Sequence, residues 1–217
     1  MISLLITLVI SKDFKIIGKT FSVVKIVMEK FVSIYVLAIL LFVGYIYGQK
    51  SELVKVKSSV DGREYLVRDL EDKKGAADLL ARVRKKLVTL ANHLEKKHSK
   101  DPRIQRMIRN FNPDAISEST PKSTYTSYSI NKGEKIVFCL RSRNDKQELA
   151  EENLLMFVAL HEMGHVITES IGHTQEFWDN FRYLLEHAIK IGVYTKEDFK
   201  NNPREYCGTQ ITDSPLP

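Results

Sequence analysis

The stretch "LHEMGHVITESIGHTQEFW", residues 160–178, brings three histidines close together in the chain. His161 and His165 are four residues apart, Glu162 follows the first of them, and His173 comes eight residues after the second. Positions i and i+4 of a helix lie on one face about one turn apart. The two histidines of the first pair can therefore direct imidazole nitrogens at one ion, which makes this stretch a candidate zinc centre.

Glu162 is rotated away from the line of the two histidines and is better placed for chemistry than for metal binding. Zinc lowers the pKa of water toward ~7. A carboxylate beside such a water can take one of its protons and later pass the proton to a leaving amine. The sequence thus indicates hydrolysis with Glu162 as the catalytic residue.

A catalytic zinc site takes three protein ligands and keeps one position open. His173 is the best third ligand, because Gly172 lets the chain turn back toward the helix that it has just left. Acidic residues of the next predicted helix are the alternatives: Glu176, Asp179 and Glu186.

Periodicity predicts a mixture of helices and strands. Alternating residues on both sides of Asp61-Gly62 predict a hairpin with a tight turn. Apolar spacing and capping residues predict the helices. The predicted elements are strands within 53–68 and within 124–140, a long helix over 74–98, a short helix over 103–109, helices from Asp145 to about Ser170 and over 175–190, and a last short helix from Thr195.

Residues 31–48, "FVSIYVLAILLFVGYIYG", carry no charged side chain. At ~1.5 Å per residue a helix of this length nearly matches a hydrocarbon core of ~30 Å. Tyr35, Tyr45 and Tyr47 lie near its ends, where aromatic rings prefer the membrane interface. We therefore expect a single-pass transmembrane helix, with a buried core helix as the alternative.

The expected domains are an N-terminal segment 1–30, the transmembrane helix, and a folded domain over 49–217. Met28 is an alternative start of translation, and that start would favour a cytosolic domain under the positive-inside rule. Cys139 and Cys207 are too few for a disulfide framework and favour reduced thiols, in agreement with that orientation.

The formal net charge of +6 is unevenly distributed. Residues 49–110 carry +8, whereas residues 111–217, which contain the histidines, carry −5. The basic side chains of the long helix fit a solvated face. Contact with an anionic membrane or with nucleic acid phosphates is the alternative, but no aromatic residues are interleaved for base stacking. Nucleic acid is therefore a weakly supported partner.

"HEMGH" followed by "GHTQEFW" resembles the small zincin peptidase domains of the WLM and SprT-like type. In these domains an H-E-x-x-H motif is followed by a third histidine and then by Phe-Trp or a similar pair, which Phe177 and Trp178 match. The resemblance implies an α+β, zincin-like fold with a small antiparallel sheet and an active-site helix. It also implies one zinc ion held by His161, His165 and His173.

The same resemblance implies that Glu162 is the general base and acid of a membrane-anchored zinc metallopeptidase acting on proteins or peptides. Some relatives are DNA-dependent proteases. The anchor together with "DGREYLVRDL", residues 61–70, resembles anchored WLM-like proteins of large DNA viruses, which places the chain in a virion or host membrane. A catalytically inactive, zinc-stabilised and membrane-tethered structural or interaction protein is the alternative function. Candidates for a transition-state stabiliser are Tyr183, Tyr194 and Tyr206.

Overall fold

The computed structural model describes residues 28–44 and 52–217. The chain divides into two compact units, Met1–Ser51 and Glu52–Pro217. In the first unit, residues 28–44 form a helix with exposed side chains.

The described part of the chain contains no helix that is both long and apolar enough to cross a membrane. The predicted transmembrane helix over 31–48 is therefore not supported. Residues 45–48 of that prediction, and nearly all of the N-terminal segment 1–30, lie outside the described residues.

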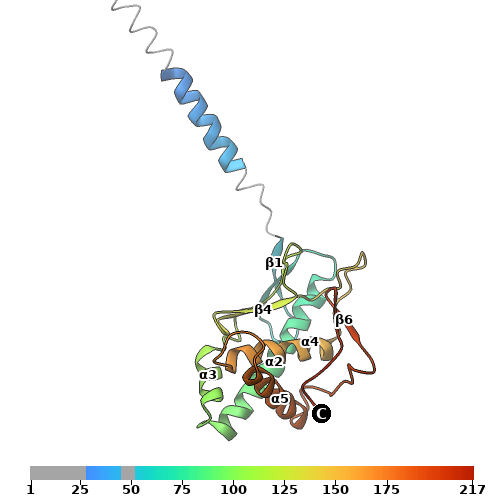
Figure 1. The fold of residues 1–217 in the computed structure, drawn as a ribbon. Coiled ribbons are helices and arrows are strands. Elements are labelled where there is room, and N and C mark those ends of the chain that lie inside the picture. Colours follow the sequence, from blue (N-terminus) through green and yellow to red (C-terminus); the bar gives the residue numbers. More distant parts are fainter. Residues whose placement is uncertain (1–27, 45–51) are drawn as a thin grey trace, which may run out of the picture. The chain divides into compact units, whose positions relative to one another are not determined.

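The second unit is a mixed α+β structure (Figure 1). Its elements, in chain order, are β1 (Leu53–Lys57), β2 (Glu64–Arg68), α2 (Lys73–His98), α3 (Pro102–Asn110), β3 (Ile116–Glu118), β4 (Ser127–Ile130), β5 (Lys135–Phe138), α4 (Glu152–Ile167), α5 (Gln175–Lys190), β6 (Arg204–Tyr206) and β7 (Thr209–Ile211).

The larger sheet has the strand order β1-β2-β3-β5-β4, and β6 pairs with β7 in a separate hairpin. β1/β2 and β4/β5 are antiparallel, but β2/β3 and β3/β5 are parallel. The expectation of an antiparallel sheet is therefore wrong. The helices α2 and α3 connect β2 to β3, and a crossover of this kind returns the chain in the same direction. β4 is left at an edge of the sheet.

The predicted hairpin at the start of this unit is confirmed, with Leu53 opposite Arg68. Its connection is longer than the expected tight turn, because the strands end at Lys57 and begin again at Glu64. Gly62 adopts a φ of +72° within this loop, a conformation that glycine takes without steric cost.

The predicted helices over 74–98, 103–109 and 175–190 correspond to α2, α3 and α5. α4 begins later than the expected start at Asp145, because the preceding segment folds back on the residues that follow β5. Arg141 pairs with Leu149, and the backbone N–H of Ala150 donates to the carbonyl of Leu140. Within the described residues 52–217, no helix begins at Thr195. The C-terminal tail, which shows little periodicity, instead forms β6 and β7.

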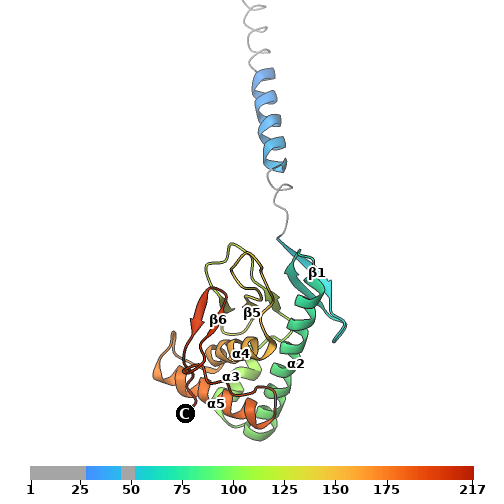
Figure 2. The same ribbon diagram turned by 90° about the vertical axis from the view of Figure 1, so that its right-hand side faces the viewer.

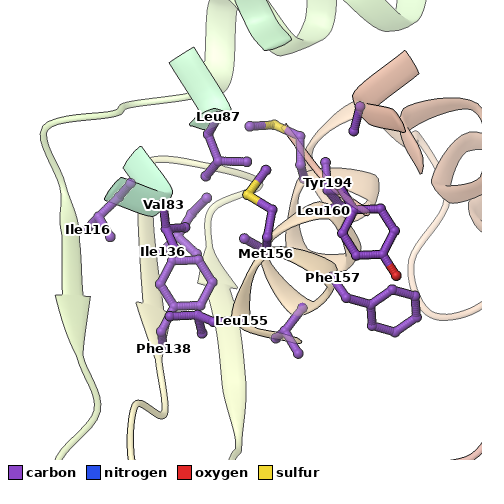
Figure 3. Close-up of a cluster of buried hydrophobic side chains, with 14 of the residues drawn as sticks. Val83, Leu87, Ile116, Ile136, Phe138, Leu155, Met156, Phe157, Leu160 and Tyr194 are labelled. Carbon is purple, nitrogen blue, oxygen red and sulfur yellow. The ribbon is translucent and has the colours of Figure 1, made fainter. Parts of the chain in front are cut away.

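α4 is the central helix of the unit, with α2, α3, α5 and β4 as neighbours (Figures 1 and 2). Its sequence is apolar on nearly every side, which is typical of a fully buried helix. Figure 3 shows its side chains meeting those of α2 and the sheet in one core; the labelled members include Val83, Leu87, Ile136, Phe138, Leu155 and Met156. The histidine pair of α4 therefore stands on a rigid element.

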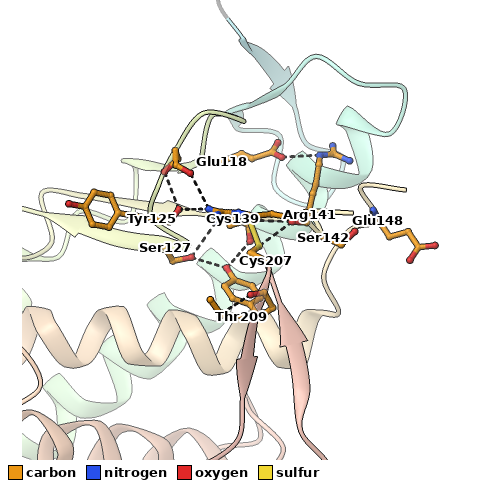
Figure 4. The surroundings of a disulfide bond; sticks show 12 residues. Glu118, Tyr125, Ser127, Cys139, Arg141, Ser142, Glu148, Cys207 and Thr209 are labelled. Atoms are coloured by element: carbon orange, nitrogen blue, oxygen red, sulfur yellow. Dashed lines mark hydrogen bonds and ion pairs between the residues drawn. A yellow bond between two sulfur atoms is a disulfide. The ribbon is translucent and has the colours of Figure 1, made fainter. Parts of the chain in front are cut away.

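Cys139 and Cys207 form a disulfide, which corrects the expectation of reduced thiols (Figure 4). The two residues are 68 positions apart in the sequence, and their Cα atoms lie 6.3 Å apart. Two isolated cysteines at such a separation give no sequence signal. They pair because the fold brings the end of β6 to the end of β5. The cysteines consequently no longer argue for a cytosolic domain.

Candidate metal centre

Three histidines converge at the end of α4. His161 and His165 come from this helix, and His173 comes from the segment that connects it to α5. The three side chains offer ligand atoms that all lie within 4.8 Å of one another. The ring centroids form a nearly equilateral triangle, with separations of 5.0, 4.9 and 4.9 Å.

This geometry fits a zinc ion. Nε2 of His173 lies 3.0 Å from Nε2 of His161. Two imidazole nitrogens that bind one tetrahedral zinc at ~2.05 Å are about 3.3 Å apart. Burial lowers the pKa of His161 to about 3 and that of His165 to about 4, with a further contribution from the neighbouring imidazoles. Both rings therefore favour the neutral form, which is the form that binds metal.

The ring of Phe177 lies against all three imidazoles. Its centroid is 4.3 Å from that of His165, in a stacked arrangement, and 4.8 Å from those of His161 and His173. Phe177 is fully buried, and the absence of a side chain at Gly164 permits its close approach, since a Cβ there would lie 3.0 Å from the ring. The sequence marked Phe177 only as a family match; its role in fixing the imidazole orientations follows from the structure.

Glu162 is buried beside the histidines, on the wall of the cavity that they face. Burial raises the pKa of its carboxyl group to about 7, although the backbone N–H of Ser129 in β4 donates to it and opposes this shift. A carboxyl group with a pKa near neutrality can both take up and release a proton, as a general base and acid must.

The cavity has a volume of about 680 Å³ and is bounded by α4, β4, the segment before α5 and the C-terminal hairpin. Of the three candidate tyrosines, Tyr206 lines it. Tyr183 packs against His187, and Tyr194 packs against Phe157 in the core. The Tyr206 hydroxyl donates to the carbonyl of Cys139 at 2.6 Å. Its pKa is raised chiefly by burial, and the charge of Glu162 contributes.

The acidic alternatives to His173 have other partners or positions. Glu176 accepts the backbone N–H groups of Glu169 and Ser170. Asp179 accepts from the side chain of Gln175. Glu186 is an exposed residue of α5 outside the cavity lining. The geometry therefore favours His173 as the third ligand.

Two basic side chains hold the backbone of segment 167–170, which leads to His173, in place. Lys132 Nζ donates to the carbonyls of Thr168, Glu169 and Ser170 at 2.8, 3.1 and 2.7 Å. The guanidinium of Arg106 donates to the carbonyl of Ile167 at 2.7 Å. The end of α4 and the start of the next segment are thus held in one conformation. Gly172, with a φ of +84°, then turns the chain so that His173 returns to the helix.

We expect Lys132→Met to weaken zinc binding by about 10- to 100-fold, the range found when groups that orient metal ligands are removed. Methionine cannot donate to the three carbonyls, so the segment before His173 loses its main support. Competition with a chromophoric chelator measures the zinc dissociation constant directly.

Lys146→Met provides the matched control, because Lys146 is an exposed lysine that does not line the cavity. Its zinc affinity should equal that of the wild type. Equal affinities for all three proteins would show that Lys132 does not support the third histidine.

Comparisons with known proteins identify the family of this chain and several of its relatives. The family model described as WLM domain matches residues 63–216. An uncharacterized protein of Acanthamoeba polyphaga mimivirus is 34% identical over 171 residues, covering 77% of this chain and 86% of that protein. An uncharacterized protein of Invertebrate iridescent virus 6 is 34% identical over 100 residues, covering 46% of this chain and 52% of that protein.

Among solved structures, the crystal structure of Wss1 from Saccharomyces cerevisiae is similar at a TM-score of 0.44 and 19% identity, covering 57% of this chain and 84% of Wss1. The WLM match spans more than two thirds of the chain and includes every residue of the candidate metal centre. The chain therefore belongs to the WLM domain family, and it has relatives in large DNA viruses.

Proposed function

We propose that this chain is a zinc-dependent metallopeptidase that hydrolyses peptide bonds. The observation that carries the proposal is the convergence of His161, His165 and His173 on one point, with the buried Glu162 beside them in the same cavity. Membership of the metallopeptidase-like WLM family supports the same reading.

His161, His165 and His173 would hold the zinc through their imidazole nitrogens and leave one side open toward the cavity. When bound there, zinc would polarise the scissile carbonyl and lower the pKa of the attacking water. Phe177 keeps the three rings in a fixed arrangement, so little reorganisation accompanies the reaction.

Glu162 performs the proton transfers. Its carboxylate accepts a proton from the attacking water, and the resulting carboxylic acid donates that proton to the leaving amine. The backbone N–H of Ser129 holds the carboxylate in place. Glu162 is almost fully buried, so the packing around α4 restricts the position of its carboxylate.

The test is hydrolysis of an unstructured protein, such as casein, by the purified full chain supplied with zinc. Activity should disappear on addition of a zinc chelator and return with excess zinc, and it should withstand inhibitors of serine and cysteine proteases. These inhibitors exclude a contaminating protease of another class.

A catalytically inactive protein that uses zinc only for stability is the second candidate. It predicts that chelation lowers the midpoint of thermal unfolding while no substrate is cleaved at any zinc concentration. The combination of bound zinc and absent hydrolysis would overturn the proposed peptidase.

A further inference from the structure

Ile171 has an unusual position for a large apolar residue. Its side chain is 90% exposed, which makes it the most exposed large hydrophobic residue of the described unit 52–217. It lies two residues before His173 and lines the same cavity as the histidines and Glu162.

This exposure does not come from a loose loop. Lys132 binds the three carbonyls just before Ile171, and the Glu176 carboxylate accepts the N–H groups of Glu169 and Ser170 at 2.9 and 3.1 Å. The backbone is therefore fixed by its polar groups, while the isoleucine side chain is directed away from the protein interior. A rigid segment loses little conformational entropy when an apolar group of a ligand covers its exposed apolar side chain.

Trp178 is a second partly exposed apolar residue that lines the cavity beside the metal centre. Its indole ring is partly exposed, at 39%, lines the cavity, and lies 5.7 Å from the ring of His173 at an interplanar angle of 30°. Ile171 and Trp178 thus lie on either side of His173 in the sequence and border the same cavity. We call these two residues the apolar rim.

We propose that the apolar rim is a specificity subsite that binds a bulky apolar side chain of the substrate within two residues of the scissile bond. This inference rests on the proposed peptidase function. The substrate class is accordingly a peptide segment with Leu, Ile, Met or Phe at that place. Burial of such a side chain removes apolar surface of both partners from water, and serine in the same place gains no comparable contact. A single apolar contact of this size changes kcat/KM by about tenfold or more.

The test begins with the wild-type full chain and a protein digest whose cleavage sites are mapped by mass spectrometry. Bulky apolar residues should be enriched within two positions of the cleaved bond. The best substrate is then synthesised together with a copy in which the enriched apolar residue is replaced by serine. The ratio of kcat/KM for the two peptides should be at least about ten for the wild type.

Ile171→Ser should reduce this ratio to one third or less of the wild-type value. The substitution removes a side chain that is already exposed, so its zinc content and thermal unfolding should match those of the wild type. Ile108→Ser is the matched control, because Ile108 is an isoleucine of α3 that is 47% exposed and does not line the cavity. The control should keep the wild-type ratio.

The outcomes separate the two proposals. Absence of cleavage by the zinc-loaded wild type overturns the peptidase function itself. Cleavage with the same ratio in the wild type and Ile171→Ser leaves the function standing and overturns the apolar rim. Light scattering tests whether a second copy of the chain covers the apolar rim instead. If the wild type is a dimer, Ile171→Ser is a monomer and the kcat/KM ratio for the two peptides is unchanged, the rim serves self-association and the inference is overturned.

Discussion

Replacing Glu162 with glutamine is expected to lower the rate of peptide hydrolysis by about 10²- to 10⁴-fold, the contribution typical of a positioned general base and acid. Glutamine has nearly the same shape but neither accepts the proton of water nor returns it to the leaving amine. Burial already favours the neutral form of this carboxyl group, whose pKa is raised to about 7. The variant should therefore fold as well as the wild type.

The measurements are kcat/KM on a cleaved peptide, zinc content by mass spectrometry, and the midpoint of thermal unfolding. Zinc content should not change, because the three histidines are intact. Glu186→Gln is the matched control, since Glu186 is an exposed glutamate of α5 outside the cavity lining. Retention of full activity by the Glu162 variant would refute the assigned mechanism.

The local part of the site was readable from the sequence because the spacing of its residues is a helical spacing. His161 and His165 stand on one face of α4 whatever the rest of the fold does. The position of His173 was harder to predict from the sequence, because it depends on a turn. Gly172 signalled that turn, but the carbonyl contacts of Lys132 that fix it come from a residue 40 positions upstream of Gly172 and have no sequence signal.

Long-range features account for most of the incorrect expectations about the fold. The parallel pairing of β3 depends on how α2 and α3 return the chain, and the three-residue strand β3 is too short to show a period. The later start of α4 arises from contacts between Arg141 and Leu149. Pairing of Cys139 with Cys207 likewise needs the completed fold. Each of these features is set by tertiary packing, which local propensity does not report.

The disulfide is expected to contribute about 4 kcal/mol to the free energy of unfolding, from the chain entropy of a closed loop of this length. The double variant Cys139→Ala/Cys207→Ala should lose this contribution. Activity should also fall, because the disulfide holds the hairpin β6/β7, whose residues form one wall of the cavity. The Tyr206 hydroxyl lies 2.8 Å from Ser127 Oγ and donates to the Cys139 carbonyl, so the hairpin and the sheet are joined at the same place.

Urea unfolding with and without dithiothreitol measures this effect. The reductant should lower the stability of the wild type to that of the double variant and should leave the double variant unchanged, which makes the variant its own control for other effects of the reagent. The chain has two cysteines, so thiol titration of the unfolded protein reports their state directly. Two titrated thiols in protein purified without reductant would contradict the disulfide. Equal stability of the oxidised wild type and the double variant would instead show that the hairpin is held by Tyr206 and the backbone alone.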